Sequence, residues 1–413
     1  MTMHITAPER RATATQGWTL ASANWLSVIA TTAIAPVLPQ ISQHFASVPN
    51  AGALIGLVAT IPAFFVAVCA WPAGLLADKF GIRRVLLFGV GLYGIAGCAP
   101  MVLDNLTAII VTRASVGILE AIIMTCSTAL VADYFHGDTR DKWLAVQTGG
   151  ASMIATGIVI LAGIMGNQGW RVPFAMYAWG FILFPLCIFK VWEPNAQEKA
   201  AVQQAQAALA TSEHRSPDSK SFKWGSLVPL FFLTWFSSTA FYVLILQLGY
   251  ILGSRGIPVA GVIGMVMAVM SVCMTLGAVI FKVLRLPVAG KLTISYGLSA
   301  IGFCMVALAQ GLPMTIVGSC ITGFGSGMVL PTLITWVLSK LPMRVRARGT
   351  GIWQSSFFLG QFASPQIVLF LQLRFGGISH AVLCYSGFMA VAAIFALFAF
   401  VRTGLTGRMV EAE

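Results

Sequence analysis

The stretch GLLADKFGIRRV, residues 74–85, is a short charged turn between two long apolar runs, 51–77 and 84–103. Its glycines permit close approach and left-handed backbone geometry. Apolar runs of about 20 residues are long enough to span a bilayer as helices, and a lone acid followed by basic residues suits the water-facing end of such a pair. The stretch therefore predicts two membrane-spanning helices joined by a tight turn.

The composition extends this prediction to the whole chain. Of the 413 residues, 58% are hydrophobic and only 9% are charged, whereas soluble domains are about a quarter charged. A soluble enzyme is therefore excluded, and we predict an all-α integral membrane protein. The apolar runs give twelve predicted spans, at residues 18–40, 51–77, 84–103, 105–133, 142–166, 171–192, 224–253, 258–283, 289–310, 313–338, 349–373 and 378–402.

The positive charges predict how the chain is oriented. If both termini are cytoplasmic, 21 of the 25 lysines and arginines lie on the inner side, with Arg171, Arg255 and Arg374 outside and Arg113 within a span. Such a bias is the positive-inside rule. We therefore predict a multi-pass protein of a bacterial-type inner (plasma) membrane. The net charge of +12 is a by-product of this topology, so no nucleic-acid partner is expected.

One long polar segment divides the chain. Residues 193–223 are rich in Ala, Gln, Ser and charge, as expected of a linker. We predict a six-helix bundle in residues 1–192, a cytoplasmic linker in 193–223 and a second six-helix bundle in 224–413.

The turn in residues 74–85 also carries a resemblance. Gly74, Asp78, Lys79, Gly81, Arg83 and Arg84 resemble the G-x-L-A-D-(R/K)-x-G-x-(R/K) signature of the major facilitator superfamily, in the loop where that family carries it. Asp78 is placed to meet a helix N-terminus or a loop arginine. The resemblance implies two six-helix halves, a gating role for this motif, and a solute site between the halves near the bilayer midplane. A faint second copy has Gly277 and Lys282 at the same spacing, with Phe281 in place of Asp78.

The fourth predicted span carries two charges, Arg113 and Glu120. Ionisable residues inside a membrane are costly and point to function. At seven residues apart they share a helix face, about 10 Å apart along the axis. They resemble the R-x-x-x-G-x-x-E form found among proton-coupled organic anion symporters and lysolipid- and sphingolipid-type transporters of this superfamily. The resemblance implies that Glu120 carries a proton and that Arg113 is its partner or contacts an anion; a static buried pair is the structural alternative.

The remaining spans bear on the direction of transport. The tenth has Ser319, Gly323 and Ser326 at the matching spacing, without charges. In the fifth, residues 157–166 lack the proline of the glycine-rich segment typical of the superfamily's drug–proton antiporters. Symport is therefore preferred, with drug efflux by proton antiport as the alternative.

Neutral polar and aromatic residues complete the predicted cavity, although about half of such groups are expected to bond helix to helix instead. The candidates are Asn24, Trp25, Gln147, Trp235, Tyr242, Trp336, Trp353 and Gln354. This composition suits an amphipathic or monoanionic organic solute. The eight cysteines include no CxxC pair and the five histidines lie at termini or span ends, so no metal or cofactor is expected.

Together these features predict a secondary transporter. The expected partners are a small-molecule substrate, protons and the lipid bilayer, and the chain is expected to act as a monomer. A membrane receptor or membrane-embedded enzyme is the rival class. It is disfavoured because the spans contain no clustered His or Cys and no paired carboxylates, and because the longest soluble stretch has about 30 residues, too few for an independent output domain.

Overall fold

The computed structural model describes residues 12–194, 224–341 and 343–410. Within these ranges, twelve helical segments are long and apolar enough to cross a membrane, which confirms the predicted all-α membrane fold. Most of the predicted linker, residues 195–223, lies outside the described residues. The halves on either side are called the first half (residues 12–194) and the second half (residues 224–410).

The described part of the first half contains eleven helical elements. They are α1 (Ala14–Asn24), α2 (Leu26–Thr32), η1 (Ala35–Val37), α3 (Leu38–His44), α4 (Ala51–Phe80), α5 (Ile82–Cys98), η2 (Ala99–Met101), α6 (Leu106–Tyr134), α7 (Gly137–Gly166), η3 (Val172–Ala178) and α8 (Trp179–Lys190). The second half contains η4 (Trp224–Leu227), α10 (Val228–Ser254), α11 (Ala260–Val283), α12 (Val288–Leu308), α13 (Leu312–Lys340), α14 (Met343–Phe375) and α15 (Ile378–Val410).

The first span differs from the single helix that the sequence predicts. It runs from Ala14 to His44 but is divided into α1, α2, η1 and α3. Pro36 and Pro39 lie at the starts of η1 and α3, where a proline has no N–H to donate to the preceding turn. The breaks before η1 and α3 therefore have a local cause. Within α2, the carbonyl oxygen of Ala30 accepts hydrogen bonds from the side chains of Arg113 and Tyr177.

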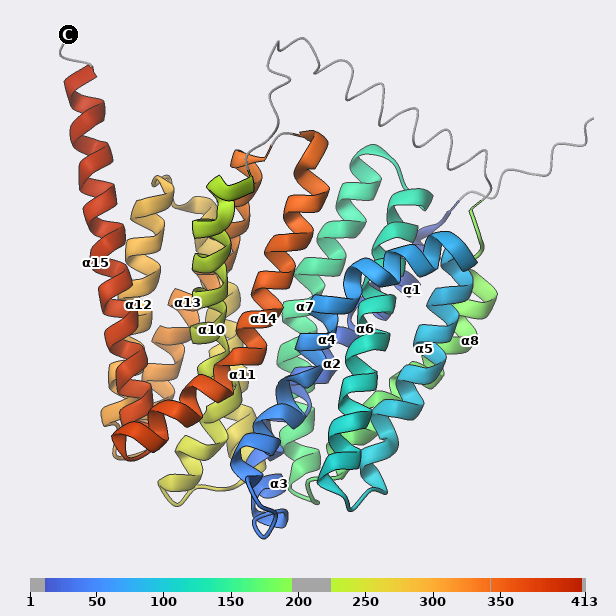
Figure 1. The fold of residues 1–413 in the computed structure, drawn as a ribbon, viewed down its shortest axis with the longest axis horizontal. Helices are drawn as coiled ribbons and strands as arrows, with labels where there is room; N and C mark the ends of the chain where they lie inside the picture. Colours follow the sequence, from blue (N-terminus) through green and yellow to red (C-terminus); the bar gives the residue numbers. More distant parts are fainter. Residues whose placement is uncertain (1–11, 195–223, 342, 411–413) are drawn as a thin grey trace, which may run out of the picture.

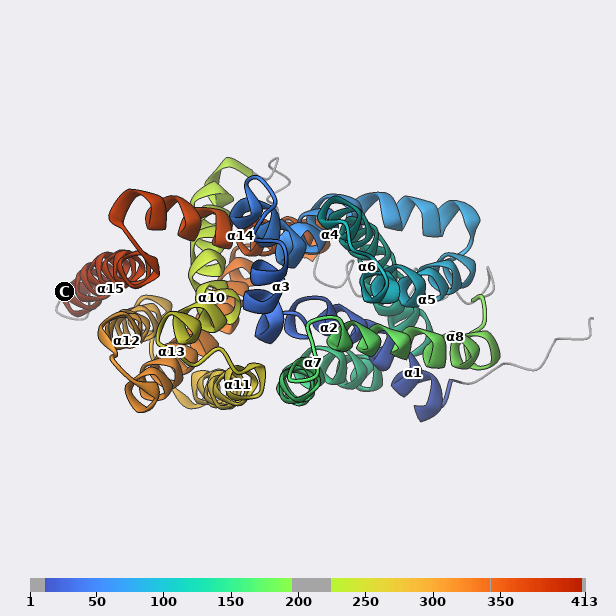
Figure 2. The same ribbon diagram turned by 90° about the horizontal axis from the view of Figure 1, so that it is seen from below.

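Each half has its own apolar core. In the first half, buried residues such as Leu26, Leu86 and Val116 form one cluster. In the second half, Val243, Phe303 and Leu333 belong to another. Figure 1 shows the second half on the left and the first half on the right, with α4, α7, α11 and α14 between them. Two helix pairs join the halves, α4 with α14 and α7 with α11, and Figure 2 shows both pairs from below.

The two ends of the molecule are named here by the linker. The linker end holds the C-terminus of α8 and the start of α10, and the far end holds α3 and the α10–α11 turn (Figure 1). At the far end the backbones of α7 and α11 approach closely, because a Cβ on Gly163 would lie 2.9 Å from the carbonyl oxygen of Ala260. Nearby, Gly261 N donates to Asn167 Oδ1 at 2.9 Å. The halves are therefore packed together at the far end.

Candidate functional site

Arg113 lies on α6 and is completely buried. Its Nε donates to the carbonyl oxygen of Val58 at 3.1 Å. Its two terminal nitrogens donate to the Tyr177 hydroxyl and to the carbonyl oxygen of Ala30, and its guanidinium lies 5.3 Å from the centre of the Tyr177 ring. One side chain thus joins α6 to α2, α4 and η3. Desolvation of the cation is offset by hydrogen bonds from every guanidinium nitrogen.

The local sequence explains how α6 reaches this position. Asn105 caps its first turn, because Oδ1 accepts hydrogen bonds from the N–H groups of Thr107 at 2.9 Å and Ala108 at 3.2 Å. Further along, a Cβ on Gly117 would lie 2.6 Å from Pro62 Cα. Only glycine allows α6 and α4 to cross at this distance. Arg113 and Glu120 lie one turn before and one turn after this crossing.

Glu120 is the buried acid of the described chain, with only 4% of its surface exposed. Its Oε2 is buried and has no hydrogen-bond partner. Neither Arg113 nor Glu120 forms an ion pair with any of the described residues. Arg113 and Glu120 therefore share a helix face but form no salt bridge.

Tyr242 is the residue of the second half that lies near Glu120. It lies on α10, within electrostatic range of Glu120, and packs against the apolar core of the first half. Its ring is 5.6 Å from that of Phe357 on α14, which in turn stacks on Trp353 at 6.0 Å. The indole N–H of Trp353 is buried without a partner. Tyr242, Phe357 and Trp353 thus form one aromatic surface, and Tyr242 is its member within electrostatic range of Glu120.

The other cavity candidates do not all join this surface. In the first half, Trp25 Nε1 donates to the carbonyl oxygen of Gln147 at 2.9 Å, and Gln147 Nε2 donates to that of Leu20 at 3.4 Å. Asn24 Nδ2 donates to the hydroxyls of Ser127 and Thr128, each at 3.4 Å. These three candidates, Asn24, Trp25 and Gln147, bond helix to helix within the first half.

Among the described residues, no ring contact or hydrogen bond joins the other three candidates of the second half to the aromatic surface. Trp235 stacks on Phe232 at 5.5 Å. Trp336 packs against apolar clusters of the second half. Gln354 follows Trp353 on α14 and is half-buried. Of the eight cavity candidates, Tyr242 and Trp353 are therefore brought together through Phe357.

The turn with the signature motif lies at the linker end. Gly81 has a φ of +92°, a conformation that favours glycine. The carboxylate that caps α5 belongs to Glu193, which accepts from the N–H groups of Ile82 at 3.0 Å and Arg83 at 2.9 Å. Arg83 also donates from Nε to the carbonyl oxygen of Val191 at 2.6 Å and from its NH2 group to that of Ile188 at 2.8 Å. The motif is thus attached to the end of α8.

The other motif residues make fewer contacts. Asp78 is exposed and forms no ion pair with the described residues, so the acid that meets the helix N-terminus is Glu193 and not Asp78. Lys79 Nζ lies 5.3 Å from the centre of the Phe80 ring. A Cβ on Gly74 would have no neighbour within 4 Å, and Arg84 is exposed.

Three of the interacting residues were not identified from the sequence. Tyr177 could have been, because the chain has only seven tyrosines and a phenol within an apolar run needs a hydrogen-bond partner. Glu193 and Phe357 carried no comparable signal. Glu193 begins a polar segment, and Phe357 is one of 27 phenylalanines.

Comparison with known proteins identifies the architecture. The Major Facilitator Superfamily model matches residues 20–365. The multidrug resistance protein MdtM of Escherichia coli is 23% identical over 293 residues, which are 66% of this chain and 67% of that protein. The quinolone resistance protein NorA of Staphylococcus aureus is 22% identical over 179 residues, which are 42% of this chain and only 45% of the length of that relative.

Solved structures agree with the fold. The inward-open xylose transporter XylE of E. coli superimposes with a TM-score of 0.74 at 15% identity, covering 93% of this chain and 95% of that one. A mutant of the peptide transporter POT gives a TM-score of 0.73 at 15% identity, covering 94% of each chain. These are folds of membrane transporters, as the sequence predicted.

Proposed function

Because the chain belongs to the major facilitator superfamily, we propose that it is a proton-coupled secondary transporter. Its substrate is a small amphipathic or monoanionic organic solute, and Glu120 binds the proton. The observation that carries this proposal is the Glu120 side chain, which is 4% exposed and has one carboxylate oxygen without any hydrogen-bond partner. Burying an ionised carboxylate without a partner costs several kcal/mol. Protonation removes that cost.

The position of Glu120 suits a coupling role. It belongs to the first half, whereas Tyr242, within its electrostatic range, belongs to the second. When the halves move relative to each other, the surroundings and hydration of the acid change together. A change in hydration shifts the balance between the charged and neutral forms of a carboxylic acid. Proton binding and the conformational step are thereby linked.

Arg113 has a different role in this proposal. Each of its guanidinium nitrogens already donates to an acceptor within the first half. We assign it to the framework that positions α6, and hence Glu120, rather than to direct contact with an anion. The solute would lie instead against Tyr242, Phe357 and Trp353, where aromatic faces suit an apolar or amphipathic molecule.

The orientation follows from the charge distribution. With the linker end in the cytoplasm, as the positive-inside rule predicts, closure of the halves at the far end corresponds to an inward-facing arrangement. The membrane would then be a bacterial-type inner membrane. The close packing of Gly163 against Ala260 and the Gly261–Asn167 hydrogen bond support this assignment of the closed end.

Proteoliposomes test the coupling. A panel of radiolabelled amphipathic and monoanionic solutes is first screened for uptake with and without a pH gradient. For an active solute, Glu120→Gln should abolish gradient-driven accumulation yet permit exchange at equal concentrations. Glu120→Asp keeps a titratable group and should retain part of the accumulation. If Glu120→Gln still accumulates solute against a gradient, Glu120 is not the coupling residue.

A second candidate function is efflux of lipophilic compounds by proton antiport. It is favoured by the relatives MdtM and NorA, which are named for resistance to drugs. The same assay separates the two directions of coupling. A symporter accumulates solute in liposomes with an alkaline lumen, whereas an antiporter accumulates it in liposomes with an acidic lumen.

A further inference from the structure

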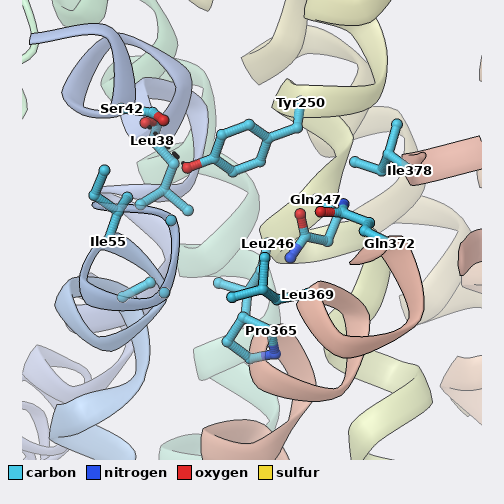
Figure 3. Close-up of a pocket in the computed structure, with 13 residues that line it drawn as sticks. Leu38, Ser42, Ile55, Leu246, Gln247, Tyr250, Pro365, Leu369, Gln372 and Ile378 are labelled. Carbon is cyan, nitrogen blue, oxygen red and sulfur yellow. Dashed lines mark hydrogen bonds between the residues drawn. The ribbon is translucent and has the colours of Figure 1, made fainter. Parts of the chain in front are cut away.

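A cavity lies at the far end, and Glu120 is not among the residues that line it. It has a volume of about 320 Å³, within the lower part of the range for small-molecule sites. Its walls come from α3 and α4 of the first half and from α10, α14 and α15 of the second. Figure 3 shows the side chains that line it. We call this cavity the far-end pocket.

Two hydrogen bonds between the halves lie close to the far-end pocket. On its far-end side, the Tyr250 hydroxyl donates to the carbonyl oxygen of Leu38 at 3.3 Å, which joins the halves (Figure 3). Towards the middle of the spans, Gln361 Nε2 donates to Thr31 Oγ1 at 2.7 Å, again between the halves. The residues that line the pocket include neither Glu120 nor any member of the aromatic surface.

The polar groups of the far-end pocket are neutral. Its polar lining side chains are Ser42, Gln247, Tyr250 and Gln372, and the rest of the lining is apolar or glycine. Gln247 is only 7% exposed, and its amide makes no hydrogen bond with the described residues. Figure 3 shows it among the side chains that surround the space, next to Gln372. The amide is therefore free to hydrogen-bond to a solute bound in the pocket.

We propose that the far-end pocket binds an uncharged solute that carries an amide or hydroxyl between apolar groups. The Gln247 amide supplies both a donor and an acceptor for it, and no charged side chain lines the walls. Because both halves form these walls, a bound solute stabilises the arrangement in which the far end is closed. The pocket is thus a state-selective site, separate from the site of coupling.

Benzanilide is a suitable probe, because it places one amide between two aromatic rings. Binding is measured by isothermal titration with the full-length protein in nanodiscs, where both ends are accessible. No pH gradient or transported solute is present, so the result does not depend on the proposed coupling. trans-Stilbene has a similar shape without the amide and should bind at least tenfold more weakly. Equal binding of the two compounds would overturn the proposed polar recognition.

Two kinds of variant locate the bound probe. Gln247→Leu should weaken benzanilide binding at least tenfold and leave stilbene binding unchanged. Gly52→Leu should block both compounds, because a Cβ there has only Leu369 Cδ1 nearby, at 3.8 Å, and the larger side chain fills the pocket. Leu373→Ala is the matched control, since Leu373 follows Gln372 on α14 but is 81% exposed. Wild-type binding by both pocket variants would rule the site out.

State selectivity needs a separate variant. Gly163→Trp places a large side chain against the backbone of α11, where even a Cβ would lie 3.0 Å from Gly264 Cα, and should force the far end apart. Gly157→Trp lies on the same helix in open space and is the control. Benzanilide affinity should fall at least tenfold in the first variant and stay unchanged in the second. Unchanged affinity in Gly163→Trp, with the far end shown to be open by spin-label distances, would contradict state selectivity.

Discussion

Helices α6 and α13 hold equivalent positions in the two halves but differ in their chemistry. Both cross a neighbour at a glycine: a Cβ on Gly117 would lie 2.6 Å from Pro62 Cα, and one on Gly323 would lie 2.7 Å from the carbonyl oxygen of Met270. On α6 the flanking positions are Arg113 and Glu120. On α13 they are the hydroxyls of Ser319 and Ser326, so that a repeated crossing carries charges in only one half.

The glycine at each crossing is required by packing, whereas the residues that flank it differ between the two halves. A close backbone crossing admits glycine alone, so this position is retained in both halves. The flanking positions tolerate different residues, provided that their polar groups are satisfied or inexpensive to bury. Arg113 is satisfied by Ala30, Val58 and Tyr177, whereas the small Ser319 hydroxyl is buried with no partner.

The largest effect is expected at the crossings themselves. Gly117→Val and Gly323→Val should each destabilise the protein by about 3 kcal/mol or more, because the new side chain must overlap backbone atoms that cannot move aside. The measurements are the yield of monodisperse protein and its melting temperature in detergent. Gly157→Val, in open space on α7, should behave like the wild type. If Gly323→Val were as stable as the wild type, the second half would not require glycine at this crossing, and the comparison of the two halves would be wrong.

The flanking positions should respond unequally. Arg113→Met removes the donors for two carbonyl groups and a phenol in a buried site, and should cost about 3 kcal/mol of stability. Ser319→Ala should stay within about 0.5 kcal/mol of the wild type, because the hydroxyl already lacks a partner. Thermal unfolding in one detergent compares them directly. Equal losses in both variants would show that the charged flank has no special structural role.

The turns at the linker end offer a smaller contrast. Glu193→Gln should cost about 1 kcal/mol, because it removes the negative charge that caps α5. Asp78→Asn should hardly change stability, since Asp78 is exposed and forms no ion pair with the described residues here. It should instead slow turnover more than it weakens solute binding, as expected if Asp78 pairs only in the other end-state. A tenfold loss of binding affinity with an unchanged conformational rate would refute that role.

The smallest effect concerns the corresponding turn of the second half. Lys291 Nζ lies 4.0 Å from the centre of the Phe281 ring and donates to the Phe281 carbonyl oxygen at 3.2 Å. Lys291→Met should therefore lower the free energy of unfolding by about 0.5–1 kcal/mol without slowing turnover. Melting curves measure the first effect and initial transport rates measure the second. A clear drop in rate would show that this turn gates the cycle despite having no acid.

The sequence was a good guide to the spans and a partial guide to the site. Runs of apolar residues predict all twelve spans because each run carries its own signal. The break within the first span was missed, although Pro36 and Pro39 provide a local cause. Pro62 and Pro72 lie inside α4 without ending it, so proline alone does not identify a break.

The hydrogen-bond partners in the candidate site could not be predicted from local sequence patterns. Helical spacing predicts that Arg113 and Glu120 share one face of the helix, but it does not predict whether the two side chains pair. The acceptors of Arg113 come from residues between 55 and 83 positions away. The cap on α5 likewise comes from Glu193, more than 100 positions along the chain. Such partners depend on how helices are placed in three dimensions, which no local pattern contains.

The hydrogen bonds of Arg113 also bear on the order in which the protein is built. All its acceptors precede residue 178, and Glu193 follows soon after. Synthesis proceeds from the N-terminus, and early segments can fold before later ones exist. A nascent chain that has reached the end of α8 therefore already contains every group needed to shelter its most costly buried cation. The first half can therefore be complete in the lipid while the ribosome is still making the second half. The guanidinium of Arg113 is then already hydrogen-bonded, so it is not an unsatisfied group that attracts quality-control proteases.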